Sequence, residues 1–99
     1  MARLEPDTRK QLILESAVFL AQHCGYKTVR RDEISALAGC ASSLVAHYFT
    51  SVKELQRVIM QYAVDNEDLN IIAQGLVAND PIALNAPQEL KTLAANSLL

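Results

Sequence analysis

Apolar residues recur along the chain at three- and four-residue spacings, which is the period of one face of an α-helix. The first such stripe consists of Ile13, Ala17, Leu20 and Cys24, joined by Leu12, Val18 and Ala21. Gly25 follows it as a left-handed C-terminal stop. Thr8 with Gln11 fits a capping box, just after the helix-starting Pro6. The pattern predicts a first helix that ends at Gly25 and contributes mainly to the core.

Two shorter patterns separated by a glycine predict a helix-turn-helix. The first helix is broken by Gly39, and its inner face consists of Ile34, Leu37 and Ala38. The second runs from about residue 41 to residue 49 and directs Val45 and Phe49 into the core. Its outward positions, which form the candidate reading surface, are Ser42, Ser43, Ala46 and His47.

A further helix and an amphipathic tail complete the pattern. Ser51 and Glu54 form a second capping box. The helix behind it carries Leu55, Val58, Ile59, Tyr62 and Ala63 on one face. The tail continues with two stripes, first Leu69, Ile72, Ala73, Leu76 and Val77, then Leu90, Leu93, Ala94 and Leu98. Helices are therefore expected throughout the tail.

Composition supports an all-α fold. The chain has 99 residues, of which 51% are apolar, with three glycines and no tryptophan, and this favours packed helices in one small domain. We expect a small helical bundle with a helix-turn-helix region at residues 1–65 and a short helical tail at residues 66–99. No apolar run approaches the roughly 20 residues of a membrane span, and a signal peptide is not recognisable. The protein is expected to be cytoplasmic, with Cys24 and Cys40 as reduced, buried thiols.

Charge is unevenly distributed along the chain, although its formal net charge is only −2. Residues 1–60 hold eight basic and six acidic residues, a formal charge of +2, whereas residues 61–99 hold one basic and five acidic residues, a charge of −4. The front segment therefore suits an anionic partner better than the tail does.

Four groups of residues match one family pattern. They are Gly25-Tyr26, Ile34-Ser-x-x-Ala38-Gly39-Cys40, His47-Tyr48-Phe49-x-Ser51 and Glu54-Leu55. In spacing, core residues and turn glycine, residues 8–63 resemble the amino-terminal DNA-binding domain of TetR-family transcriptional regulators. The resemblance implies a sequence-specific regulator, in the first instance a repressor, that binds double-stranded operator DNA with its third helix in the major groove. Paired half-sites require a two-fold dimer, so a homodimer is expected.

The resemblance also implies roles for single residues. Phosphate contacts fall to Arg30, Arg31 and Lys53, base edges to Ser42, Ser43 and Leu44, and backbone or neighbouring bases to His47 and Tyr48. Three departures remove common contacts of the family, because Ala41, Ala46 and Val52 stand where Ser, Tyr and Lys are frequent. Arg30 and Arg31 are expected to restore part of that affinity. The helix dipole disfavours positive charge at a helix start, so their position there favours an anionic partner.

The family's second domain, which binds an inducer and dimerises, has no counterpart of similar length in this chain. No small-molecule inducer is therefore expected, and a dimer must form through the tail. The candidate interface residues are Leu69, Ile72, Leu76, Leu90 and Leu93. The same stripes also fit a simple cover over the core, in which case they contact no partner.

Other classes of function find less support. The cysteines and histidines lack the paired spacing of a zinc site, so neither a metal nor another cofactor is expected. Scattered carboxylates without a nucleophile argue against an enzyme. Two alternatives stay open. One is an interaction module or regulatory antagonist on a TetR-like scaffold, and the other is the detached front of a longer regulator.

Overall fold

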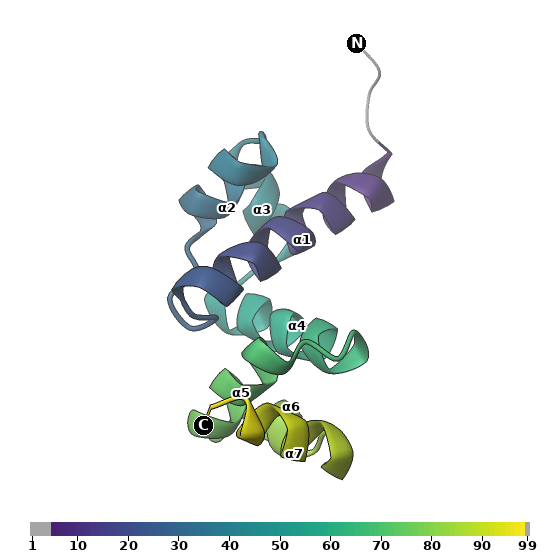
Figure 1. The fold of residues 1–99 in the computed structure, drawn as a ribbon. Coiled ribbons are helices and arrows are strands. Elements are labelled where there is room, and N and C mark those ends of the chain that lie inside the picture. The colour runs from purple at the N-terminus through teal and green to yellow at the C-terminus, as the bar shows by residue number, and fades with distance from the viewer. Residues whose placement is uncertain (1–4, 99) are drawn as a thin grey trace.

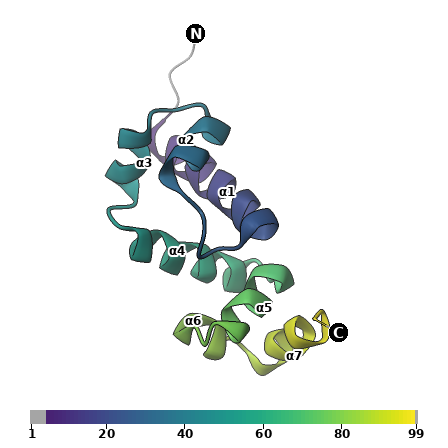
Figure 2. The ribbon, with the colours of Figure 1, turned by 90° about the vertical axis from the view of Figure 1, so that its left-hand side faces the viewer.

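Seven α-helices and no strand form the regular structure of residues 5–98 in the computed structural model of the chain, which describes all of these residues except the Pro6 side chain. In chain order they are α1 (Pro6–Cys24), α2 (Arg31–Ala38), α3 (Ser42–Tyr48), α4 (Val52–Asp65), α5 (Leu69–Val77), α6 (Pro81–Leu84) and α7 (Gln88–Asn96). The predicted all-α bundle with additional C-terminal helices is confirmed. Figure 1 shows α1, α2 and α3 above α4 and the last three helices below it, in a molecule measuring 45 × 22 × 20 Å. In the second view, α2 and α3 lie at the end opposite α7 (Figure 2).

Helix α1 begins before the predicted capping box. Glu5 is the N-cap residue, and its side chain makes no capping hydrogen bond. Pro6 takes the first helical position, where its missing N–H costs nothing because the first N–H groups have no helical partner. Thr8 therefore lies inside the first turn, and the predicted capping box with Gln11 is wrong. The predicted end is confirmed, since Gly25 has a φ of 97° and its N–H donates to the Ala21 carbonyl at 3.0 Å.

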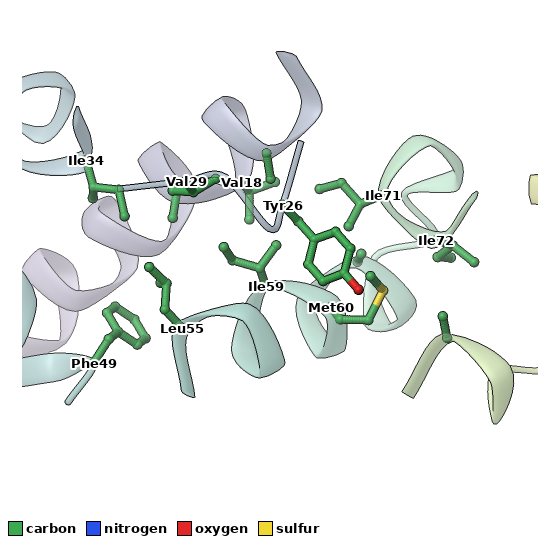
Figure 3. Close-up of a cluster of buried hydrophobic side chains, with 14 of the residues drawn as sticks. Val18, Tyr26, Val29, Ile34, Phe49, Leu55, Ile59, Met60, Ile71 and Ile72 are labelled. Carbon is green, nitrogen blue, oxygen red and sulfur yellow. The ribbon is translucent and has the colours of Figure 1, made fainter. Parts of the chain in front are cut away.

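The buried side chains of the front helices and of the tail belong to one cluster (Figure 3). Tyr26, from the connector between α1 and α2, lies in its middle, between Val18 and Ile59 on one side and Ile71 on the other. Most predicted core positions are buried in this cluster, among them Ile13, Ala17, Ile34, Val45, Phe49, Leu55, Ile59, Ala63, Ile72 and Ala94. The helical periodicity therefore identified the inner faces correctly.

Several residues predicted to lie on inner faces, Leu12 among them, are exposed instead. Cys24 is exposed in the last turn of α1, so the prediction of two buried thiols is wrong for this residue, while Cys40 is half-buried. Leu37 and Val77 have relative exposures of 50% and 71%. Periodicity determines which residues share a helix face, but it does not determine how far neighbouring helices extend along that face. Each of these residues lies where no other helix covers its face.

Hydrogen bonds tie the end of α1 to the tail. The Gln74 amide of α5 donates to the Ala21 carbonyl at 2.9 Å and accepts from the Tyr26 N–H at 2.7 Å. The Tyr26 hydroxyl donates to Asp80 at 2.9 Å, and the other oxygen of that carboxylate caps α6 by accepting from the Ile82 N–H. Burial, followed by the hydrogen bond to Asp80, raises the pKa of the Tyr26 hydroxyl. The tail is thus joined to the helix-turn-helix region by polar contacts as well as by a common core.

Candidate nucleic-acid interface

Helix α3 packs one face on the core and exposes the opposite face to solvent, beside α2 and the turn that joins the two helices. Gly39 ends α2 in the left-handed conformation, with φ of 72° and ψ of 36°, which favours glycine for backbone reasons alone because no atom lies near the position of a Cβ. The Cys40 N–H donates to the Ser35 carbonyl at 3.0 Å and closes the turn. Val45 and Phe49, with relative exposures of 0% and 1%, hold α3 on the core. The opposite face of α3 is therefore free to meet a partner.

A pair of serines links the two helices of the motif. The Ser35 hydroxyl is buried and donates to the Asp32 carbonyl at 2.9 Å, and its oxygen lies 3.1 Å from the Ser42 hydroxyl. A serine has one hydroxyl proton, and that of Ser35 is directed to Asp32, so Ser42 is the donor in the pair. The exposed Ser42 oxygen is then left with acceptor capacity only. Such a group suits an adenine or cytosine amino group better than a phosphate.

The other predicted reading residues of α3 differ in exposure. Ser43 and His47 are exposed, whereas Leu44 and Tyr48 are half-buried and pack against the core. The His47 ring stands edge-on to that of Tyr48, with centroids 5.2 Å apart and an interplanar angle of 73°. Of the five α3 residues predicted to contact DNA, Ser42, Ser43 and His47 thus have exposed side chains. The Tyr48 ring packs against that of His47.

Arg30 and Arg31, predicted together as phosphate contacts, occupy different environments. Arg30 is the N-cap residue of α2, and its side chain is 74% exposed with Nε 3.6 Å from the Asp32 carboxylate. Arg31 is half-buried, and its Nη2 donates to the Thr50 carbonyl at 2.9 Å and, at the longer distance of 3.5 Å, to the Phe49 carbonyl. Its Nε is buried without a hydrogen-bond partner among the described residues. The Arg31 guanidinium therefore fastens the start of α2 to the chain just after α3.

Basic side chains also gather where α4 begins. The predicted cap is confirmed, since the Ser51 hydroxyl accepts from the Glu54 N–H at 3.0 Å. The Glu54 carboxylate, however, pairs with Arg57 at 2.6 and 3.0 Å, and this hydrogen bonding holds the pKa of Glu54 below its usual value. Lys53 is exposed beside them.

Lys27 is a basic residue that the sequence alone did not single out. It borders the same surface hollow of about 450 Å³ as Lys53 and Arg57. Asp80 also borders this hollow, but both of its oxygens already accept hydrogen bonds, from Tyr26 and Ile82. Neither lysine has an ion-pair partner within residues 5–98. Lys27 and Lys53 are far apart in sequence. The one sequence feature that pointed to Lys27 is its position directly after the Gly25-Tyr26 motif.

The predicted tail interface is only partly accessible. Ile72 and Leu90 have relative exposures of 0% and 8%, so the prediction that they meet a partner is corrected: both are core residues, because α5 and α7 pack against each other. Leu69 and Leu76 are half-buried against the same core. Leu93 is 52% exposed and is the member of this set with most of its surface available.

No group of three His, Cys, Asp or Glu side chains within the described part of the chain is placed to hold a metal ion. None of the helices in that part combines the length and the apolarity that crossing a membrane requires. Compared with known protein families, curated protein sequences and solved structures, the chain shows no match. The case for an interface therefore rests on the geometry of α2, α3 and the start of α4.

Proposed function

We propose that the chain is a sequence-specific, TetR-like DNA-binding regulator, a repressor that inserts α3 into the major groove of operator DNA and binds as a dimer. The observation that carries the proposal is the two-sided character of α3. Its inner face is fully buried at Val45 and Phe49, while Ser42, Ser43 and His47 are exposed on its outer side. A short helix held rigidly on a core with small polar residues outward suits readout of base edges.

Phosphate contacts around α3 set the register of the protein on the duplex. Arg30 and Lys53 are exposed cations at the starts of α2 and α4. Lys27 extends this set along the hollow that it shares with Lys53. Arg31 acts chiefly as a positioning residue, because its guanidinium is engaged by backbone carbonyls at the end of α3.

The experiment is selection of bound sequences from random duplexes, followed by affinity measurements on the selected operator at several salt concentrations. His47→Ala is expected to lower affinity about 5- to 150-fold and to relax the preference at one base position, as loss of a base contact does. Lys53→Gln is expected to weaken binding to all sequences. It should also reduce the salt slope, which is the slope of log affinity against log salt concentration, by about one.

Lys91→Gln is the matched control, since it removes the same charge from the tail, where Lys91 donates to the Leu84 carbonyl. This variant should leave the salt slope unchanged. Failure to enrich any sequence, together with no salt-dependent retention of the wild-type chain on DNA, would sink the proposal.

A second candidate function is an interaction module or antagonist that binds another protein through the same scaffold. The acidic tail, with a charge of −4 over residues 61–99, favours it. The three departures from the family's phosphate contacts favour it as well. Chromatography on immobilised duplex DNA separates the two candidates, because a DNA-binding regulator elutes with rising salt and an antagonist of this kind is not retained.

A further inference from the structure

The Ser42 hydroxyl, at the first position of α3, meets a buried serine of α2. Ser35 has a relative exposure of 7%, and its Oγ lies 2.9 Å from the Asp32 carbonyl and 3.1 Å from the Ser42 Oγ. Ser42 itself is exposed. Ser35 was not among the residues predicted to contact DNA, yet it is bonded to one that was. The pair therefore joins a buried hydroxyl to one that a partner of α3 can contact.

Two hydroxyl protons are available to three groups, the Asp32 carbonyl and the two serine oxygens. A carbonyl only accepts, so the contact with Asp32 is a hydrogen bond only when Ser35 donates its single proton there. The Ser42 proton then goes to Ser35, and both short contacts are hydrogen bonds. In the opposite arrangement Ser35 donates to Ser42, and the contact with Asp32 has no proton. Loss of that bond makes the opposite arrangement about 2- to 12-fold less populated.

The direction of the Ser42 proton decides what this side chain can accept from DNA. A serine hydroxyl with a free proton contacts donors and acceptors of the bases alike. The Ser42 proton is engaged by Ser35, so its oxygen meets a base edge with lone pairs only. In the major groove adenine and cytosine present an amino donor, whereas guanine and thymine present carbonyl acceptors. A guanine or thymine oxygen would face the Ser42 oxygen with no proton between them.

We propose that Ser35 is a positioning residue that makes Ser42 select an amino base, adenine or cytosine, over a keto base, guanine or thymine, at one position of one operator strand. The inference rests on the proposed function, because it concerns the bases that α3 contacts. Adenine and cytosine are neither both purines nor partners in one base pair. Phosphate contacts carry no sequence information directly, so an amino-over-keto preference that depends on Ser35 identifies the hydroxyl pair as its source.

The test is selection of bound sequences from random duplexes by the full chain, carried out for the wild type, Ser35→Ala and Ser42→Ala. The wild type should favour amino over keto bases at one position by about 2- to 12-fold, the range set by one hydrogen bond. Ser35→Ala frees the Ser42 proton, so this preference should fall below about twofold while the preferences at the other positions are kept. Ser42→Ala removes the hydroxyl and should abolish the same preference. If Ser35→Ala does not fold, as judged by circular dichroism, Ser35→Cys replaces it, because a thiol is only a weak acceptor.

Ser16→Ala is the matched control. Ser16 is a helical serine with the same relative exposure of 7%, and its hydroxyl donates to the Leu12 carbonyl at 2.9 Å. Its removal deletes a similar buried hydrogen bond but leaves the pair of Ser35 and Ser42 intact, so every base preference should be unchanged. A loss of the amino preference in Ser16→Ala equal to that in Ser35→Ala overturns the proposal, because the preference then follows stability.

A base analogue measures the contact at a single amino group. The selected adenine is replaced by unsubstituted purine, or the selected cytosine by 2-pyrimidinone, and each analogue lacks only the amino group. The wild type should lose about 2- to 12-fold more affinity than Ser42→Ala does, since the weakened base pair affects both proteins alike. Equal losses in the two proteins overturn the proposal.

The outcomes separate this inference from the proposed function. An enriched operator with no amino preference, or with one that survives Ser35→Ala, overturns the inference and leaves the DNA-binding regulator standing. A chain that enriches no duplex fails as a DNA-binding regulator, and the inference fails with it.

Discussion

Replacing Arg31 by alanine tests whether this residue positions α3. The substitution removes the charged hydrogen bond to the Thr50 carbonyl at 2.9 Å and the longer one to Phe49. A hydrogen bond to a charged group contributes about 1.5–3 kcal/mol, and the unpartnered Nε offsets part of it, so a loss of about 1–2 kcal/mol in unfolding free energy is expected. For a chain of this size that lowers the melting temperature by roughly 5–15 °C.

Arg30→Ala is the matched control for this experiment. The Arg30 side chain is 74% exposed and only approaches Asp32, so its removal should change stability by less than about 0.5 kcal/mol. Thermal and urea unfolding of both variants provide the measurement. Equal stability of the two would refute the positioning role of Arg31.

DNA binding by the same variants gives a second readout. Arg30→Ala should flatten the salt dependence of binding, as expected for loss of a phosphate contact. Arg31→Ala should lower affinity with little change in salt slope, because it disturbs α3 and not the charge facing DNA. Arg31→Lys separates the roles further, since lysine keeps the charge but lacks the guanidinium group whose Nη2 donates to both carbonyls. Full affinity in Arg31→Lys would favour a direct phosphate contact.

Three further predictions concern stability. Gly75→Ala should lower the free energy of unfolding by about 1–2 kcal/mol despite the better helix propensity of alanine, because the added Cβ would lie 2.6 Å from the Ala83 Cβ. A variant that is more stable than the wild type in urea unfolding would contradict this. Ser51→Ala should cost about 1 kcal/mol through loss of the α4 cap, and Ser51→Asp should restore the loss in the same assay. Because burial and Asp80 raise the folded-state pKa of Tyr26 above its unfolded value, the Tyr26 contribution is fully present below about pH 10 and is lost as pH rises beyond it. Relative to Tyr26→Phe, the wild type should therefore lose about 1.4 kcal/mol per pH unit above pH 10, and parallel pH profiles would refute the assignment.

Residue type and spacing correctly predicted those features of the fold that depend only on residues close together in the sequence. The cap at Ser51, the left-handed turn at Gly39 and the inward positions Val45 and Phe49 of α3 are of this kind. Each depends on backbone geometry or helical period over a few residues, so residue type and spacing predict it. The capping box predicted at Thr8 was wrong because two local signals competed, and the earlier start at Pro6 prevailed.

The sequence by itself thus determined the helices, the helix-turn-helix and the faces that turn inward. Only the tertiary structure decided which side chains remain available to a partner. Arg31 is engaged by carbonyls after α3, Ile72 is buried against neighbouring helices, and Val77 is uncovered beside a groove. The physical reason is that helical period is a property of neighbouring residues, whereas exposure depends on where distant segments end and what they cover.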